Sequence, residues 1–117
     1  MGYVPDCDGD RGNVVVYDEQ THRAMIIGAQ EVFSVCVIAE LAHLQWSGKI
    51  DVDKNGNPLT KCAVVVNDPT SLMVNEICSC FGVEIHSSEV GEANVVGLAK
   101  KLRDQVFHFI FLFHFIS

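Results

Sequence analysis

The sequence predicts an α/β fold, in which strands and helices alternate along the chain and pack as layers. A continuous apolar run at residues 62–66 is typical of a strand buried on both faces. It is followed by helix, strand and helix patterns over residues 68–81, 83–87 and 91–103. Strands that alternate with helices in this way pair in parallel through right-handed crossovers.

The first half of the chain is less regular. The first eleven residues hold three aspartates, an arginine and a glycine, which is typical of a loop, and residues 13–17 predict a short strand. Residues 29–46 contain neither proline nor glycine and predict a helix that Gly48 ends. We expect the apolar spacing of this helix to place its core face on Val32, Val35, Cys36, Ala39, Ala42, His43 and Trp46.

The second half has clearer boundaries. Asp68 is expected as the N-cap of a helix with Pro69 at its first position, and Gly82 is expected to end it. On that helix we expect Cys80 in the core and Cys78 partly exposed. The helix at 91–103 is expected to bury Val95, Leu98 and Leu102.

Composition excludes several functional classes. The 117 residues (12.9 kDa) are 49% hydrophobic and carry a net charge of −7, so we expect a folded chain that does not bind nucleic acid. The longest apolar run, residues 106–116, is too short for a membrane helix, so no membrane association is expected. Five cysteines at irregular spacing, without a signal peptide, favour a reduced, cytoplasmic protein.

Residues 5–11 are the segment that carries chemistry. Three carboxylates at alternate positions, Asp6, Asp8 and Asp10, can converge on one divalent cation, because their mutual repulsion favours an occupied site. Oxygen ligands suit Mg²⁺ or Ca²⁺ better than zinc. Gly9 permits a tight turn, and Arg11 supplies a fixed positive charge.

The sequence at residues 6–11 resembles the metal loop of the α-D-phosphohexomutase family, which includes the phosphoglucomutases and phosphomannomutases and typically has Asp-Pro-Asp-Gly-Asp-Arg there. Later landmarks follow in the family's order: a long helix, the apolar strand and helix start at 64–71, residues 81–85, and a Val-Gly-Glu turn at 90–92. The resemblance covers roughly residues 3–105. It implies a three-layer α/β/α unit with a small mixed sheet, like domain III of the family.

The resemblance also implies a domain division and a function. Residues 1–20 would be the end of domain II with the metal loop, 21–105 would be most of domain III, and 106–117 a divergent hydrophobic tail. Asp6, Asp8 and Asp10 would bind Mg²⁺, and Arg11 would be a catalytic residue near the family's phosphoserine. The expected function is that of a fragment of an intramolecular phosphotransferase acting on hexose phosphates.

Departures from the family pattern bear on activity. Cys7 replaces the usual proline, and neither a serine-nucleophile loop nor the Gly-Glu-x-Ser-Gly sugar loop is found. No substrate-binding residue can therefore be assigned, glucose and mannose phosphates cannot be distinguished, and we expect the chain alone to be inactive. A divalent-metal-binding α/β module without catalysis is the alternative from outside the enzyme class.

Four other patterns could also carry chemistry. Residues 6–9 match the first motif of haloacid-dehalogenase-type phosphatases, with Asp6 as nucleophile and Asp8 as general acid/base, but that motif should end a hydrophobic strand. Residues 51–56 resemble the start of an EF-hand loop, yet Cys62 stands where the bidentate glutamate is needed, so a turn is expected. Cys78 and Cys80 lack a second ligand pair for zinc, and His108 and His114 lack a carboxylate partner.

Overall fold

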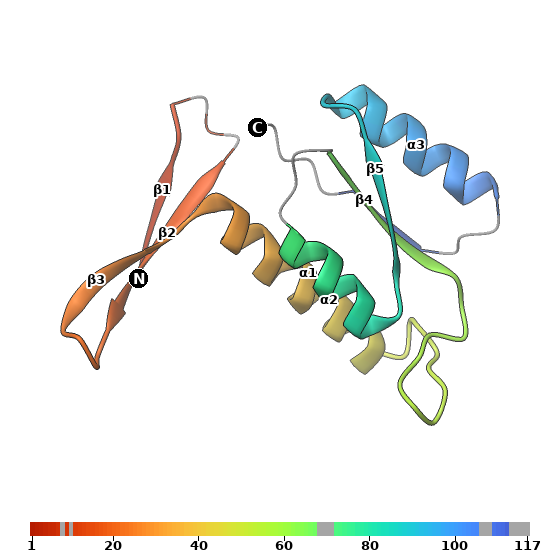
Figure 1. Cartoon of the computed structure of the whole chain (residues 1–117), viewed down its shortest axis with the longest axis horizontal. Coiled ribbons are helices and arrows are strands. Elements are labelled where there is room, and N and C mark those ends of the chain that lie inside the picture. Colours follow the sequence, from red (N-terminus) through yellow and green to blue (C-terminus); the bar gives the residue numbers. More distant parts are fainter. Residues whose placement is uncertain (8, 10, 68–71, 106–108, 113–117) are drawn as a thin grey trace.

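The computed structural model describes residues 1–7, 9, 11–67, 72–105 and 109–112. It has mixed α/β content, and its described strands form two separate three-stranded sheets instead of one mixed sheet (Figure 1). The first sheet is antiparallel and lies at one end of a long helix. The second sheet is parallel and packs against this helix and the other two described helices.

The antiparallel sheet has the order β1 (Gly2–Pro5), β2 (Gly12–Asp18), β3 (Arg23–Ile27). The expectation of a loop over the first eleven residues is therefore wrong for β1, which pairs with β2 from Gly2 opposite Val15 to Pro5 opposite Gly12. The pairing also explains Gly12. A Cβ atom at this position would lie 2.0 Å from the Tyr3 ring of the neighbouring strand.

A tight turn at residues 19–22 joins β2 to β3. The Asp18 carboxylate accepts hydrogen bonds from the Gln20 amide (2.9 Å) and the Thr21 hydroxyl (2.6 Å), and the Thr21 bond is the main cause that lowers the pKa of Asp18. The expected domain boundary after residue 20 falls within this turn, between two paired strands.

The parallel sheet has the order β5 (Glu84–Ser88), β4 (Cys62–Asn67), β6 (Phe109–Leu112). All six residues of β4 are buried, as the apolar run predicts. The backbone of β6 pairs with β4 from Cys62 opposite Phe109 to Val65 opposite Leu112. Part of the hydrophobic tail is therefore a strand of this sheet.

Alternate residues of β4 join two separate hydrophobic clusters. Val64 and Val66 pack with helices α1 (Ala29–Trp46) and α2 (Leu72–Phe81). Ala63 and Val65 pack with α3 (Glu92–Asp104), which buries Val95 and Leu102 and partly buries Leu98 as expected. Because side chains alternate between the two faces of β4, the three described helices all pack against this one strand.

Helix α1 has the predicted bounds but buries a different face. Its core residues are Phe33, Ser34, Val37, Leu41 and Leu44. The expected face is largely exposed, with Val35 at 59% and Trp46 at 85%. The prediction was wrong because the helix is apolar on two opposite sides, so that spacing alone does not decide which side meets the sheet.

Helix α2 ends at Phe81, and Gly82 follows it with φ +66°, as predicted. The expectations for its cysteines are reversed, since Cys78 is buried and Cys80 is exposed. Cys78 lies four residues after the buried Val74 and next to the buried Ile77, which places it on the sheet side of the helix. The predicted cap at Asp68 and Pro69 lies outside the described residues, as do His108 and His114.

Substitutions on opposite faces of α1 should differ sharply in stability. We expect Leu41→Ala to lower the free energy of unfolding by about 2–5 kcal/mol, because it opens a cavity in the core. Val35→Ala on the exposed face should change it by less than about 0.5 kcal/mol. Chemical denaturation monitored by circular dichroism measures both, and a larger loss for Val35→Ala than for Leu41→Ala would mean that the helix is turned the other way.

Thiol labelling should divide the cysteines into two classes. Burial raises the pKa of Cys78 to about 11 and also raises that of Cys62, so both favour the unreactive protonated form at pH 8. We expect Cys7, Cys36 and Cys80 to react quickly with an aromatic disulfide reagent, and the two buried thiols to react only on unfolding. Mass spectrometry of the labelled sites checks this, with denatured protein as the control for five accessible thiols.

Candidate functional site: the acidic hairpin loop

The acidic segment forms the loop of the hairpin between β1 and β2. The Asp6 amide donates to the Arg11 carbonyl at 3.0 Å, which extends the pairing of the two strands by one step. The Gly9 amide donates to the Asp6 carbonyl at 3.2 Å, and Gly9 has φ +77°. That left-handed conformation explains why a glycine stands in the middle of the loop.

The Asp6 carboxylate closes the loop from within. Its Oδ1 atom accepts hydrogen bonds from the amides of Gly9 (3.0 Å) and Arg11 (3.3 Å). An aspartate that binds backbone amides a few residues ahead is a common way to hold a turn. Asp6 therefore has a structural role that its place in a row of carboxylates did not reveal.

Arg11 faces the same carboxylate. Its Nε atom lies 3.7 Å from Asp6 Oδ2, and the side chains of Arg11 and Asp6 are 37% and 27% exposed. This distance is an ion pair and too long for a hydrogen bond. The Nε atom is itself buried and has no hydrogen-bond acceptor among the described residues. The Arg11 guanidinium is thus held beside the loop, and its Nε–H group remains able to donate a hydrogen bond.

The structure brings together two of the four site residues predicted from the sequence. Asp6 and Arg11 meet at the base of the loop, whereas Asp8 and Asp10 lie outside the described residues. Over the described ranges, no group of three metal-binding side chains occurs. Asp6 is the described carboxylate of the loop: its Oδ1 atom accepts the two amide hydrogen bonds, and its Oδ2 atom lies beside Arg11.

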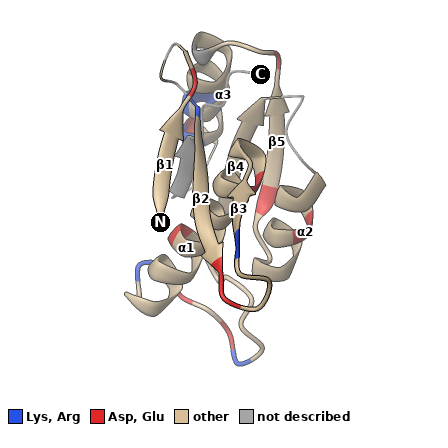
Figure 2. Ribbon diagram, turned by 90° about the vertical axis from the view of Figure 1, so that its left-hand side faces the viewer, with Lys and Arg blue, Asp and Glu red and all other residues tan. Residues whose placement is uncertain are grey.

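The loop lies toward the same end of the molecule as the carboxyl ends of β4 and β5, at the top of Figures 1 and 2. In open α/β sheets this edge is where ligands usually bind. β4 ends there at Asn67, a buried polar residue whose register partner on β5 is Ser88. Sequence reasoning did not select Asn67, although a polar residue that follows three consecutive valines at the end of a strand is a signal for such an edge.

The EF-hand-like segment is a turn, as expected. Asp53 accepts hydrogen bonds from the backbone amides of Asn57 (2.9 Å) and Asn55 (2.8 Å), and from the Asn57 side chain (3.3 Å). The Asn57 amide is the main cause that lowers the pKa of Asp53. These bonds stabilise the turn, so the Asp53 carboxylate is occupied in holding the backbone.

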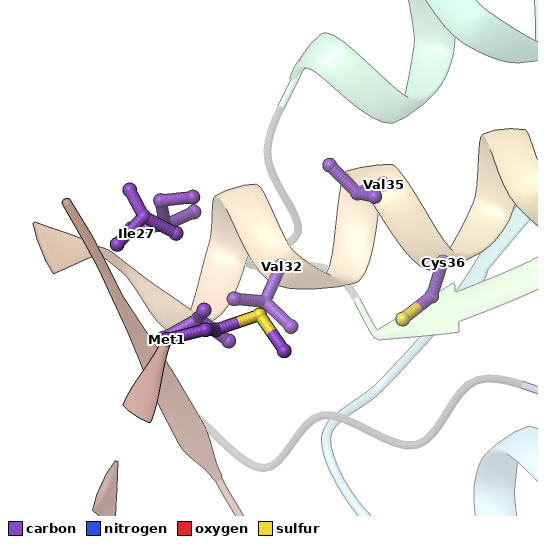
Figure 3. A pocket seen from close by; sticks show the side chains of 7 residues that line it. Met1, Ile27, Val32, Val35 and Cys36 are labelled. Carbon is purple, nitrogen blue, oxygen red and sulfur yellow. The ribbon is translucent and has the colours of Figure 1, made fainter. Parts of the chain in front are cut away.

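A cavity of about 280 Å³ lies between the antiparallel sheet and α1 (Figure 3). Its lining residues are all apolar: Met1, Val14, Val16, Ile27, Val32, Val35 and Cys36. A site for a polar substrate needs several directed donors or acceptors, which this cavity does not provide. Met1, Val35 and Cys36 of its lining are exposed, so it is an open apolar hollow that offers no polar contact to a phosphorylated substrate.

Comparison with known proteins does not extend this description. No family model matches the sequence, and neither curated proteins nor solved structures gave a match. Among the described helices, none is long and apolar enough to cross a membrane.

The Asp6 hydrogen bonds should be measurable in the loop amides. Asp6→Asn keeps an acceptor oxygen at the Oδ1 position, whereas Asp6→Ala removes it. We expect hydrogen exchange at the Gly9 and Arg11 amides to be about tenfold faster in Asp6→Ala and little changed in Asp6→Asn. Equal exchange rates in both variants, measured by NMR, would show that Asp6 does not close the loop.

Proposed function

We propose that this chain is part of a phosphohexomutase-type phosphotransferase and that residues 6–11 form its divalent-cation loop. The observation that carries the proposal is the hairpin loop itself. Its first carboxylate is fixed by the Gly9 and Arg11 amides, its glycine adopts the left-handed turn, and its arginine lies beside the carboxylate. Asp6, Gly9 and Arg11 of this motif therefore each have a physical role in the loop.

The donor chemistry of the segment fits Mg²⁺. Alternate residues of a chain have Cα atoms at most about 7 Å apart, so carboxylates at positions 6, 8 and 10 can share one centre. A loop charge of three acids against one arginine favours a cation. Bound there, Mg²⁺ would neutralise charge on a phosphoryl group.

Within this proposal Arg11 is an anion-binding residue. Its guanidinium lies at the rim of the loop, partly exposed, with a buried Nε that has no acceptor in the described part of the chain. Such a group can bind phosphate oxygens while the carboxylates hold the cation. A phosphorylated hexose is the substrate class, bound only when the loops that supply the nucleophile and the sugar contacts are also present.

The finer domain assignment belongs to the same proposal. Packing of α1 and α2 against one side of β4 and of α3 against the other supports a three-layer α/β/α unit for residues 21–105. Residues 1–20 would then belong to the preceding domain, with residues 106–117 as the divergent end.

The non-catalytic metal-binding module is the second candidate, and it requires the same loop. A haloacid-dehalogenase-type phosphatase has less support. Asp6 follows β1, whose four residues are all exposed and which pairs only in an antiparallel hairpin, whereas that motif should end a hydrophobic core strand.

Magnesium titration tests the loop. We expect weak Mg²⁺ binding by the full chain in calorimetry, and at least about tenfold weaker binding by Asp8→Asn, because the variant loses one of three carboxylates. Asp51→Asn, which removes a carboxylate from a different acidic turn, is the matched control and should titrate like wild type.

Identical titrations of wild type and Asp8→Asn would remove the site. A coupled hexose-phosphate mutase assay, primed with the bisphosphate activator, separates the candidates further. We expect no turnover by the chain alone. Mg²⁺-dependent turnover that Asp8→Asn abolishes would contradict the fragment proposal and favour Asp6 as a nucleophile.

A further inference from the structure

The chain exposes more surface than a compact protein of its size. Its accessible surface is 7576 Å², about 1,300 Å² more than the roughly 6,300 Å² expected for a folded 12.9 kDa monomer. Its radius of gyration is 15.8 Å, against about 13.4 Å for a compact domain of 117 residues. A standard protein interface buries about 800 Å² on each partner, so the surplus is large enough for one.

The antiparallel sheet exposes apolar side chains on all three strands. Over β1, β2 and β3 the only charged residues are Asp18 and Arg23, which are register partners at one end, and Figure 2 shows the rest of the strands without charge. Apolar side chains on it are exposed, including Tyr17 at 61% and Ile26 at 72%. An uncharged sheet of this kind is typical of a covered surface.

The edge formed by β3 is the least protected part of the sheet. β3 pairs with β2 on one side, and no described strand pairs with its other side. Natural edge strands are usually blocked by proline, by charge or by a bulge. The opposite edge, β1, ends in Pro5, whereas β3 has four consecutive uncharged residues, Ala24–Ile27, and no proline.

We propose that β3 pairs antiparallel with β3 of a second copy of this chain, centred on Met25, to give a continuous six-stranded sheet. In this register Ala24 lies opposite Ile26 of the partner subunit and Met25 opposite Met25 of the partner subunit, so apolar residues face apolar residues at the three central positions. Arg23 lies opposite Ile27 of the partner subunit at each end of the pair. The pairing is closed and two-fold, so it ends at a dimer and does not propagate.

Charge does not oppose a second copy of this chain on this edge. The two Arg23 side chains would lie at opposite ends of the paired strands, about 14 Å apart, and each remains beside Asp18 of its own chain. The chain's net charge of −7 opposes association in general, but the described carboxylates of this sheet lie at the hairpin ends and not along β3. The uncharged edge is thus the place where two acidic chains can approach.

Sedimentation velocity of the full chain over a range of concentrations tests the proposal. We expect a species of twice the 12.9 kDa chain mass that dissociates on dilution. Met25→Lys should raise the dimer dissociation constant about tenfold or more, because it places two like charges directly opposite each other. Val4→Lys, at a position of similar exposure on the β1 edge, is the matched control and should leave the constant unchanged.

A charge-pair rescue tests the register. Met25→Lys and Met25→Glu should each be monomeric alone, and an equimolar mixture should form the heterodimer, because Met25 is opposite itself only in this pairing. If either variant fails to fold by circular dichroism, Ile26→Lys replaces it, since the two copies of Ile26 are diagonal neighbours in the pair. A monomeric wild type, a dimer that the Met25 variants leave intact, or a mixture that stays monomeric would each overturn the proposal.

Discussion

The burial of β4 on both faces is the constraint on which the parallel part of the structure depends. Its six residues are all buried, and their alternation sends Val64 and Val66 to one cluster and Ala63 and Val65 to the other. Because β5 and β6 pair on its two edges, both the helices and the neighbouring strands are positioned through this one strand. A polar residue in its middle would have neither water nor a partner on either side.

The same strand shows how much of the fold is predictable from sequence. A run of five apolar residues has only one stable use in an α/β chain, so its position, its double burial and its parallel partner β5 follow from pattern alone. Helix boundaries at Gly48 and Gly82 are equally local, since both glycines adopt a positive φ. What depends on one residue type or one short run was predicted correctly.

The errors concern choices between equivalent local patterns. α1 is apolar on both sides, and the decision between Val37 and Val35 as core residue is made by the sheet that the helix meets. Cys78 and Cys80 differ only in their angle to Val74, and β1 is a strand because β2 is beside it. Each of these three features is decided by a tertiary contact, and the spacing of apolar residues along the sequence does not report such contacts.

At the candidate site the sequence singled out Asp6 and Arg11, but it did not indicate what each side chain does in the loop. Asp6 was expected as a metal ligand and Arg11 as a catalytic residue, and the hairpin brings these two side chains together. The spacing gave no sign that Asp6 Oδ1 would be used by two backbone amides, because that depends on the turn adopted around Gly9. One carboxylate therefore serves both to hold the loop and, in the proposed function, to bind its cation.

The loop and the free sheet edge depend on one another through β2. An isolated two-stranded hairpin is only marginally stable in water, so β1, β2 and the loop between them need the third strand to stay ordered. β3 supplies that support on one side of β2, and it is also the edge proposed to pair with a second copy. A pairing that orders β3 also orders β2, whose first residues follow directly on Arg11. The loop charges, which repel one another without a cation, are best restrained when the sheet beneath them is complete.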